Sequence, residues 1–275
     1  MRSTPVYEVH AIKYAHLARK AWEVQIQPDP HDADFPMDYF VWVAIPLDEN
    51  GKRAIGGKPI VIDTGFNATV GKKRGREVKR NPADLLKDFG VDPAEVEDVI
   101  VTHLHYDHIG NWDKFPKARF HLQDKEMQFA TGRHICMGGF RHAYEIDDIV
   151  GMIRALYGQR VVFHDGDEEI APGISVHLIG GHTLGLQAVR VATRRGFVVL
   201  ASDAVHLAPH LDEMRIFPTT YNIAEVLEGY ETLKRLAPSR QHIVPGHDPG
   251  VTASYPAAKP GLEGWVVKLD EAPRG

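Results

Sequence analysis

A short polar stretch of the sequence contains three histidines and one aspartate directly after an apolar run. The residues are His103, His105, Asp107 and His108, and the run 99–101 before them has the β-branched composition of a buried strand. Buried imidazole and carboxylate groups without partners carry a large desolvation cost, so a metal centre is the economical partner for this set. The remaining interpretation is a solvated, histidine-rich turn.

The spacing within this stretch predicts two metal positions. In an extended segment His103 and His105 point to the same side, whereas Asp107 and His108 lie at the turn that follows and are aimed at a second point nearby. One short loop can therefore supply ligands to two ions.

Three isolated polar residues downstream, His182, Asp203 and His247, each follow an apolar strand. Glycines stand directly before both histidines, and a glycine lets the backbone turn sharply and close on an ion. We expect these side chains to complete the metal shell. Histidines in or beside other strand-like runs are expected to pack or to lie at the surface, and these are His10, His16, His121, His164, His177 and His242.

The composition is that of an ordinary globular protein with small-molecule partners. The chain has 275 residues, 43% of them hydrophobic, and a formal net charge of -5, which argues against general nucleic-acid binding. Cys136 is the only cysteine, so an intrachain disulfide is excluded and the cytoplasm is the expected compartment. The N-terminus lacks a signal-peptide pattern and no run reaches membrane-spanning length, so no membrane partner is expected.

Hydrophobic periodicity and turn residues predict alternating groups of strands and helices. Capping and terminating residues bound two of the predicted helices, with Asn81 and Gly90 at the ends of one and Asn222 and Pro238 at the ends of the other. The predicted strands are 6–14, 39–47, 60–62, 99–101, 118–122, 161–163, 175–179, 187–192 and 197–201, and the predicted helices are 82–89, 124–130, 146–157 and 223–236.

In these motifs and their order the sequence resembles the metallo-β-lactamase superfamily. The matching pieces are Val61-Ile62-Asp63-Thr64-Gly65, the His-x-His-x-Asp-His of 103–108, Gly-His at 181 and 182, Asp203, and Gly-His at 246 and 247. The resemblance implies an α/β (α+β) chain with a four-layer αββα sandwich. We expect one domain over 1–275, with a core at about 39–250 and an irregular tail at 251–275.

The resemblance also implies a ligand set and a metal. One ion would be bound by His103, His105 and His182, the other by Asp107, His108 and His247, with Asp203 bridging them. Zinc is the default, and iron, manganese or cobalt suit the same nitrogen and oxygen donors. True β-lactamases of the superfamily have a cysteine where this chain has Asp203, which argues against antibiotic hydrolysis. Asp63 is expected to be structural.

Within the superfamily the chain is most similar to the N-acyl-homoserine lactonase branch. The similarity predicts a quorum-quenching hydrolase in which a metal-bridging hydroxide opens the lactone ring and Asp107 passes the proton to the leaving alkoxide. The branch often has a tyrosine three residues after the bridging aspartate, where this chain has His206. His206, or Tyr221 from the same loop, is the expected hydrogen-bond donor to the substrate carbonyl.

Other functions remain open at this level. The alternatives are hydrolysis of another lactone or ester, or of a glutathione thioester as in glyoxalase II, and a non-catalytic metal-binding protein. The short tail argues against the glyoxalase, and the chain length leaves no room for the added domains of related nucleases or flavin-linked electron carriers. A homodimer is compatible with the sequence.

Two segments and a set of apolar residues have no single interpretation. The basic stretch 72–80 is either a solvated surface or a rim that attracts an anionic substrate. The glycine-rich segment 131–143 is expected to be an irregular loop that lines the pocket, rather than an extra metal site built from His134, Cys136 and His142. Candidate residues for an acyl-chain pocket are Phe35, Met37, Met137, Phe140, Leu207, Met214 and Phe217.

Overall fold

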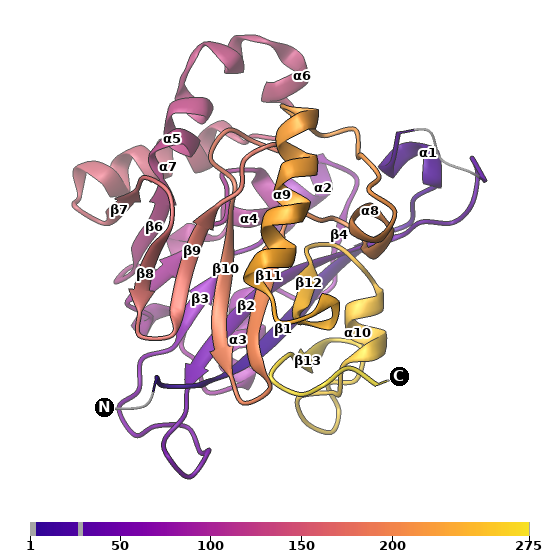
Figure 1. The fold of residues 1–275 in the computed structure, drawn as a ribbon. Helices are drawn as coiled ribbons and strands as arrows, with labels where there is room; N and C mark the ends of the chain where they lie inside the picture. The colour runs from indigo at the N-terminus through magenta and orange to yellow at the C-terminus, as the bar shows by residue number, and fades with distance from the viewer. Residues whose placement is uncertain (1–3, 27–29, 275) are drawn as a thin grey trace.

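Two β-sheets lie face to face at the centre of the fold (Figure 1). The computed structural model describes residues 4–26 and 30–274, so positions 1–3, 27–29 and 275 of the predicted domain 1–275 lie outside the described residues. The strands of the larger sheet are β1 (Tyr7–Leu17), β2 (Met37–Pro46), β3 (Ile60–Ile62), β4 (Glu77–Val78), β5 (Asp98–Ile100), β6 (Arg119–Gln123), β7 (Val161–His164) and β13 (Val266–Lys268). Those of the smaller sheet are β8 (Glu168–Ala171), β9 (Ile174–Leu178), β10 (Gln187–Thr193), β11 (Gly196–Ser202) and β12 (Ile243–Pro245).

The longer helices cover the outer faces of the two sheets. The helices of the described residues are α1 (Ala21–Val24), α2 (Ala68–Lys73), α3 (Pro82–Asp88), α4 (Tyr106–Ile109), α5 (Asp124–Thr131), α6 (Gly138–Arg141), α7 (Ile146–Tyr157), α8 (Ala208–Asp212), α9 (Ile223–Leu236) and α10 (Gly250–Ser254). In Figure 1, α9 lies across the smaller sheet, while residues of α3, α5 and α7 pack in one core with the larger sheet. Among the described helices, none combines the length and the apolar character needed to cross a membrane.

Strand β2 shows how the sequence pattern produces the layers. Tyr39, Val41 and Val43 belong to the core under the helices of the larger sheet, whereas Phe40 and Trp42 belong to the core between the sheets. Successive side chains of a strand point to opposite faces, so a strand that is apolar at every position is buried on both sides. The predicted αββα sandwich is confirmed.

Helix α9 closes the outer face of the smaller sheet, as its periodicity predicts. Val226, Tyr230 and Leu233 are buried at helical spacing against that sheet. The Asn222 side chain accepts hydrogen bonds from the backbone N–H groups of Ala224 and Glu225, at 3.0 and 3.5 Å. These bonds satisfy donors that the first turn leaves free, which fixes where the helix begins.

The strand directions bring the predicted ligands to one edge of the sandwich. β11 and β12 are parallel, and β9 has the same direction because both β9 and β11 pair antiparallel with β10. The carboxyl ends of these strands therefore lie at one edge of the smaller sheet. The loop after β5 reaches the same edge from the larger sheet, since His103 and His105 contact His182 there.

Two sequence predictions about loops need correction. The tail 251–275 is not irregular throughout, because β13 pairs with β1, with Ile12 opposite Val266 and His10 opposite Lys268. Segment 131–143 contains a 3₁₀ turn, Arg133–Cys136, and the short helix α6. Elements of three or four residues are too short to show a hydrophobic period, and only pairing with a distant strand stabilises β13.

Candidate metal centre

The predicted ligands reach the centre from four loops at the edge of the sandwich. His103 and His105 follow β5, and α4 then places Asp107 and His108 one turn further on. His182 follows Gly181, which has a positive φ of 80° and lies so near Val226 that an added Cβ would be 2.6 Å from its backbone nitrogen. Only glycine fits such a turn beside a helix.

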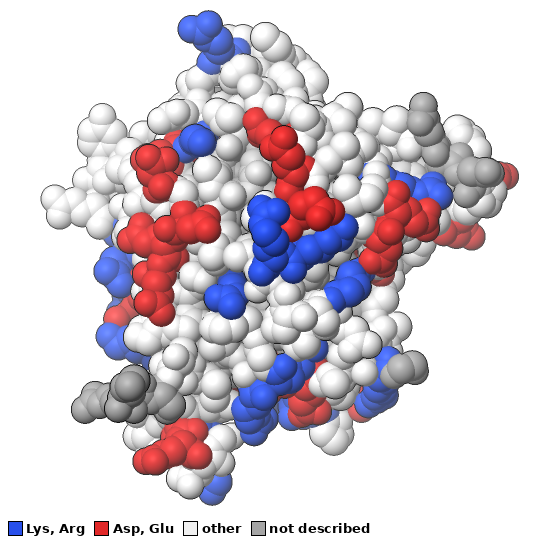
Figure 2. All heavy atoms as spheres, viewed as in Figure 1, with Lys and Arg blue, Asp and Glu red and all other residues white. Residues whose placement is uncertain are grey.

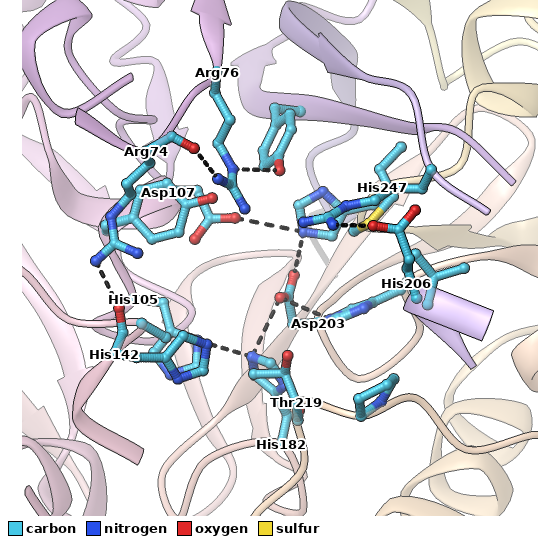
Figure 3. Close-up of a pocket in the computed structure, with 18 residues that line it drawn as sticks. Arg74, Arg76, His105, Asp107, His142, His182, Asp203, His206, Thr219 and His247 are labelled. Carbon is cyan, nitrogen blue, oxygen red and sulfur yellow. Dashed lines mark hydrogen bonds and ion pairs between the residues drawn. The ribbon is translucent and has the colours of Figure 1, made fainter. Parts of the chain in front are cut away.

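Asp203 stands between two sets of imidazoles (Figure 3). Its Oδ2 lies 3.8 Å from His103 Nε2 and 3.2 Å from His182 Nε2. Its Oδ1 lies 3.3 Å from His108 Nε2 and 3.0 Å from His247 Nε2. One carboxylate therefore faces two separate clusters of nitrogen donors.

The remaining two predicted ligands complete these clusters. His105 Nδ1 is 2.9 Å from His182 Nε2. Asp107 Oδ2 lies 3.7 Å from both His108 Nε2 and His247 Nε2. Within each cluster the candidate ligand atoms are all within 4.8 Å of one another, and the clusters are His103, His105, His182 and Asp203 on one side and Asp107, His108 and His247 on the other.

Groups behind the imidazoles hold their Nδ1 atoms and so turn Nε2 toward the centre. His108 Nδ1 donates to Asp63 Oδ2 at 2.7 Å, and Asp63 Oδ1 accepts the backbone N–H of Thr102 at 2.7 Å. His182 Nδ1 donates to the backbone oxygen of Thr219 at 2.5 Å, and His247 Nδ1 donates to that of Asp38 at 2.9 Å. Such partners fix ring orientation in metal sites. Asp63 has a structural place, as predicted.

Burial and neighbouring charges set the protonation of the cluster. Burial, together with neighbouring imidazoles, lowers the pKa values of His103 and His105 well below the ordinary histidine value. Burial also lowers the pKa of His182 to about 3. Burial would raise the pKa of Asp203, but His247 and His108 beside it hold that pKa well below its usual range. Burial would also lower the pKa values of His108 and His247, but the carboxylates of Asp203 and Asp107 beside them raise both pKa values above the ordinary histidine value. Metal binding requires neutral imidazoles, so an ion bound here would displace protons from these two rings.

The donor set fits divalent metal ions. Three buried atoms that face the centre, His103 Nε2, His108 Nε2 and Asp203 Oδ1, have no hydrogen-bond partner among the described residues. Buried polar atoms without partners are costly, and a cation would supply the missing interaction for all three. Imidazole nitrogens with carboxylate oxygens suit zinc, iron, manganese and cobalt alike.

The structure separates the two candidates for a substrate hydrogen bond. His206 lines the pocket, with its Nε2 2.9 Å from Asp203 Oδ2 and its ring stacked on Phe217 at a centroid distance of 3.8 Å. Tyr221 is not among the residues that line the pocket, and its ring packs against Phe129 at 5.1 Å. Its backbone N–H instead donates to Gly181 at 2.8 Å. Tyr221 thus supports the loop that carries His182.

A small pocket of about 120 Å³ opens onto this centre. Arg74 and Arg76 from the basic stretch and His142 from segment 131–143 contribute polar groups to its wall. Of the apolar residues proposed for an acyl-chain pocket, Met37 alone lines it. The remaining lining residues are Arg19, Glu23, Val24, Tyr39, His105, Tyr106, Asp107, Ala143, His182, Asp203, His206, Pro218, Thr219 and His247.

Segment 131–143 contributes to the pocket as expected, but through its last residues. His134 packs against Phe129 at 5.2 Å, and Cys136 is exposed. Within the described part of the chain, neither residue joins a group of ligand types close enough to hold an ion. The pocket-lining interpretation therefore applies to His142 and Ala143.

Glu126 is a supporting residue that the sequence does not reveal. Its buried carboxylate accepts hydrogen bonds from the backbone N–H of Leu104 at 2.9 Å, the Thr183 hydroxyl at 2.6 Å and the Gly185 N–H at 3.2 Å. It thus joins the His103–His105 loop to the His182 loop. The only signal would be a glutamate on the buried face of α5, which a surface helix rarely has.

Comparisons with known proteins agree with this geometry. Residues 53–247 match the family model described as the metallo-beta-lactamase superfamily. The N-acyl homoserine lactonase AttM of Rhizobium johnstonii is 28% identical over 180 residues, covering 64% of this chain and 66% of the relative. The N-acyl homoserine lactonase AiiB of Agrobacterium fabrum is 34% identical over 133 residues, covering 46% and 47%. The chain therefore matches less than two thirds of the length of these curated relatives.

Solved structures extend the likeness to most of the chain. A quorum-quenching N-acyl homoserine lactone lactonase has a TM-score of 0.70 and 21% identity, covering 90% of this chain and 94% of that chain. A probable metal-dependent hydrolase from Staphylococcus aureus also has a TM-score of 0.70, with 14% identity, covering 100% and 97%. At such identities the likeness establishes the fold.

Proposed function

The chain belongs to the metallo-beta-lactamase superfamily, and we propose that it is a metal-dependent hydrolase that opens the lactone ring of N-acyl-homoserine lactones. The names of the curated relatives support the choice of substrate. The donor set described above supports the choice of chemistry.

The observation that carries this proposal is the position of Asp203. Its two carboxylate oxygens face different imidazoles, His182 on one side and His247 on the other, at 3.2 and 3.0 Å. A purely structural salt bridge would not need so many imidazoles around a single carboxylate. Two ions sharing this group are the arrangement found in dinuclear hydrolases.

In this proposal each set of ligands holds one divalent ion, with zinc as the default metal. One set is His103, His105 and His182, the other is Asp107, His108 and His247, and Asp203 is shared. When bound, such a pair supplies Lewis acidity toward a carbonyl oxygen and a nucleophile drawn from water near neutral pH.

Two side chains of the pocket wall act on the lactone. Burial lowers the pKa of His206, so its ring is neutral and carries one N–H at neutral pH. The Nε2 of His206 lies 2.9 Å from Asp203 Oδ2, and once that oxygen binds a metal ion the N–H would turn to the lactone carbonyl oxygen, in the place of the tyrosine that the lactonase branch often has there. A water-derived nucleophile would add to the carbonyl carbon, and Asp107, which also lines the pocket, would take the proton that this water gives up and pass it to the alkoxide as the ring C–O bond breaks. The products are a carboxylate and a hydroxyl group on one opened chain.

The first test measures proton release at constant pH, because ring opening at neutral pH yields one carboxylate and one proton. Zinc-loaded and manganese-loaded protein would be compared on short and long N-acyl-homoserine lactones, a simple γ-lactone, an aryl ester and a glutathione thioester. We expect fast opening of the acylated lactones that a chelator abolishes. Reaction with the thioester or aryl ester alone would contradict the lactonase assignment.

A further inference from the structure

The basic stretch 72–80 separates into residues with and without a charged partner. Lys73 and Arg74 both pair with Glu145, at 2.6 and 2.7 Å, and Arg80 pairs with Asp88 at 2.6 Å. On the face shown in Figure 2, several basic and acidic side chains likewise lie beside one another. Lys72 and Arg76 have no carboxylate of the described residues within ion-pair distance, but Lys72 is exposed whereas Arg76 is partly buried.

Arg76 is held rigidly at the pocket wall. Its Nε donates to the Tyr39 hydroxyl at 3.0 Å, and its Nη1 donates to the backbone oxygen of Arg74 at 2.6 Å. Its guanidinium carbon lies 5.4 Å from the centre of the Tyr106 ring. These contacts leave Nη2 without an acceptor among the described residues. In Figure 3 the guanidinium reaches into the pocket between Asp107 and His247.

A partly buried cation that has only the more distant Asp107 carboxylate to offset its charge is costly, and a ligand that supplies a closer negative charge recovers part of that cost. Arginine always carries its charge, and its planar fork of N–H donors matches a carboxylate. The contacts to Tyr39 and Arg74 fix the side chain before a ligand arrives, which lowers the entropy lost on binding. Arg76 is therefore a preorganised anion site that faces the candidate metal centre.

The rest of the pocket indicates a small ligand with a single negative charge. Glu23, Asp107 and Asp203 also line the wall, and their carboxylates disfavour a dianion. The other two arginines of the wall, Arg19 and Arg74, are paired with Glu23 at 2.6 Å and with Glu145 at 2.7 Å. Arg76 and the candidate metal ligands line the same pocket of about 120 Å³, so one small ring with a carboxylate substituent can contact both.

We propose that Arg76 binds a carboxylate carried by the substrate, so that small lactones bearing a free carboxylate group are a second substrate class beside the neutral N-acyl-homoserine lactones. This inference rests on the ring-opening chemistry of the proposed lactonase function and goes beyond its substrate class. In it, Arg76 is a specificity residue, since it holds a charged substituent that does not react. The lactone carbonyl then lies toward His206 and Asp203, across the pocket from the guanidinium.

The test compares two lactones that differ only in charge, on the metal-loaded full chain. They are γ-butyrolactone carboxylate and its carboxamide, which has nearly the same shape. We expect kcat/KM for the carboxylate to exceed that for the carboxamide by about 10-fold or more, the size of a charge-assisted bidentate contact.

Three variants assign the preference to Arg76. Arg76→Gln is expected to lower kcat/KM for the carboxylate by about 10-fold or more and to leave the carboxamide nearly unchanged. Arg76→Lys keeps the charge and is expected to retain part of the preference. Arg80→Gln removes the same charge from the same segment outside the pocket, and we expect both substrates to react as with the unmodified chain. Circular dichroism verifies that each variant is folded.

A binding measurement separates recognition from catalysis. Cyclopentanone carboxylate and its carboxamide have no ester bond, so calorimetric titration reports their binding without turnover. We expect the carboxylate to bind the unmodified chain about 10-fold more tightly than the carboxamide, and Arg76→Gln to remove this difference.

The outcomes distinguish the inference from the proposed function. If lactones are opened without preference for the carboxylate, or if Arg76→Gln keeps the preference, the inference is overturned and the lactonase function stands. If no lactone is opened, the lactonase function is overturned, and the cyclopentanone pair still decides whether Arg76 binds a carboxylate. Equal binding of that pair to the unmodified chain overturns the inference in either case.

Discussion

Two buried groups of histidines in this molecule differ in whether the protein supplies hydrogen-bond partners for their ring nitrogens. On strands β6 and β7, His121 and His164 stack at 5.3 Å with Nδ1 and Nε2 3.1 Å apart. The remaining nitrogen of each ring has a carboxylate partner, Asp98 at 2.9 Å and Glu168 at 2.7 Å. Every ring nitrogen of this histidine pair is satisfied by the protein, as expected for packing residues.

The cluster at the sheet edge has the opposite character. Several imidazoles face Asp203, and His103 Nε2 and His108 Nε2 have no hydrogen-bond partner among the described residues. The number of buried histidines therefore does not identify a metal centre. The difference lies in whether their inward nitrogens have protein partners.

The largest expected loss of activity distinguishes the carboxylate of the edge cluster, Asp203, from a carboxylate of the histidine pair, Glu168. Asp203→Ala removes the shared ligand, so we expect the rate of hydrolysis to fall by more than about 100-fold and the amount of bound metal to fall with it. Removal of a residue that only supports a ligand already lowers metal affinity or activity by about 10- to 100-fold. Glu168→Ala removes the carboxylate of the histidine pair and should leave both unchanged. Assays of hydrolysis with elemental analysis of the bound metal check this, and full activity of Asp203→Ala contradicts the dinuclear proposal.

A smaller effect is expected from the carboxylates that orient histidines. Asp63→Asn weakens the hydrogen bond to His108 Nδ1, and asparagine tolerates the positive φ of 60° at this position. We expect metal affinity to fall by about 10- to 100-fold. Asp98→Asn makes the same change beside His121 and should not alter that affinity. Competition with a chelator measures the metal affinity of both variants. An equal loss of affinity in Asp63→Asn and Asp98→Asn would show that the edge cluster and the histidine pair do not differ in metal binding.

A variant of His206 tests whether one imidazole of the edge cluster contacts the substrate instead of binding the metal. His206→Phe keeps the stacking on Phe217 and removes the N–H. We expect kcat to fall by about 10-fold, less than for a dedicated oxyanion donor because Asp203 also engages this ring, while the bound metal stays constant. Unchanged kinetics would make His206 a packing residue.

The smallest effect concerns a buried histidine that belongs to neither group. Burial lowers the pKa of His210 to about 3, and its Nε2 has no partner among the described residues. The pKa in the unfolded chain is about 6.5, so as pH falls below that value the unfolded chain binds a proton that the folded chain does not. The free energy of unfolding therefore decreases from about pH 6.5 toward about pH 3.

His210→Asn removes this titration, so the variant should lose about 2 kcal/mol less than the unmodified chain between neutral pH and about pH 5. Urea unfolding of the chelated proteins at both pH values measures the difference. The metal-site histidines are present in both proteins, so the difference between the two pH profiles reports the loss of the imidazole at position 210. If the free energy of unfolding changes equally with pH in the two proteins, His210 is not held neutral by the fold.

The sequence predicts the layers and the composition of the edge cluster because both follow from local patterns. β2 is apolar from Tyr39 to Pro46, α9 is apolar at helical spacing, and the ligand types follow apolar strands. These patterns depend on neighbours in the chain, so they can be recognised without a structure.

The sequence does not predict the contacts that join distant segments. Glu126 joins the loops at Leu104 and Gly185 by hydrogen bonds across the sandwich, and nothing in its helix distinguishes it from a surface residue. Arg76 is one of several basic residues in its stretch, and only the positions of Glu145 and Asp88 reveal that its neighbours are paired and it is not. Such information depends on the folded arrangement.

The division of the candidate ligands between the two sheets has a consequence for the order of folding. His103, His105, Asp107 and His108 follow a strand of the larger sheet, and His182, Asp203 and His247 follow strands of the smaller one. Neither half of the nascent chain contains a complete ligand set before the sheets dock. Metal uptake must therefore be a late event, so the rate at which a refolding chain acquires metal would report the docking of the two sheets.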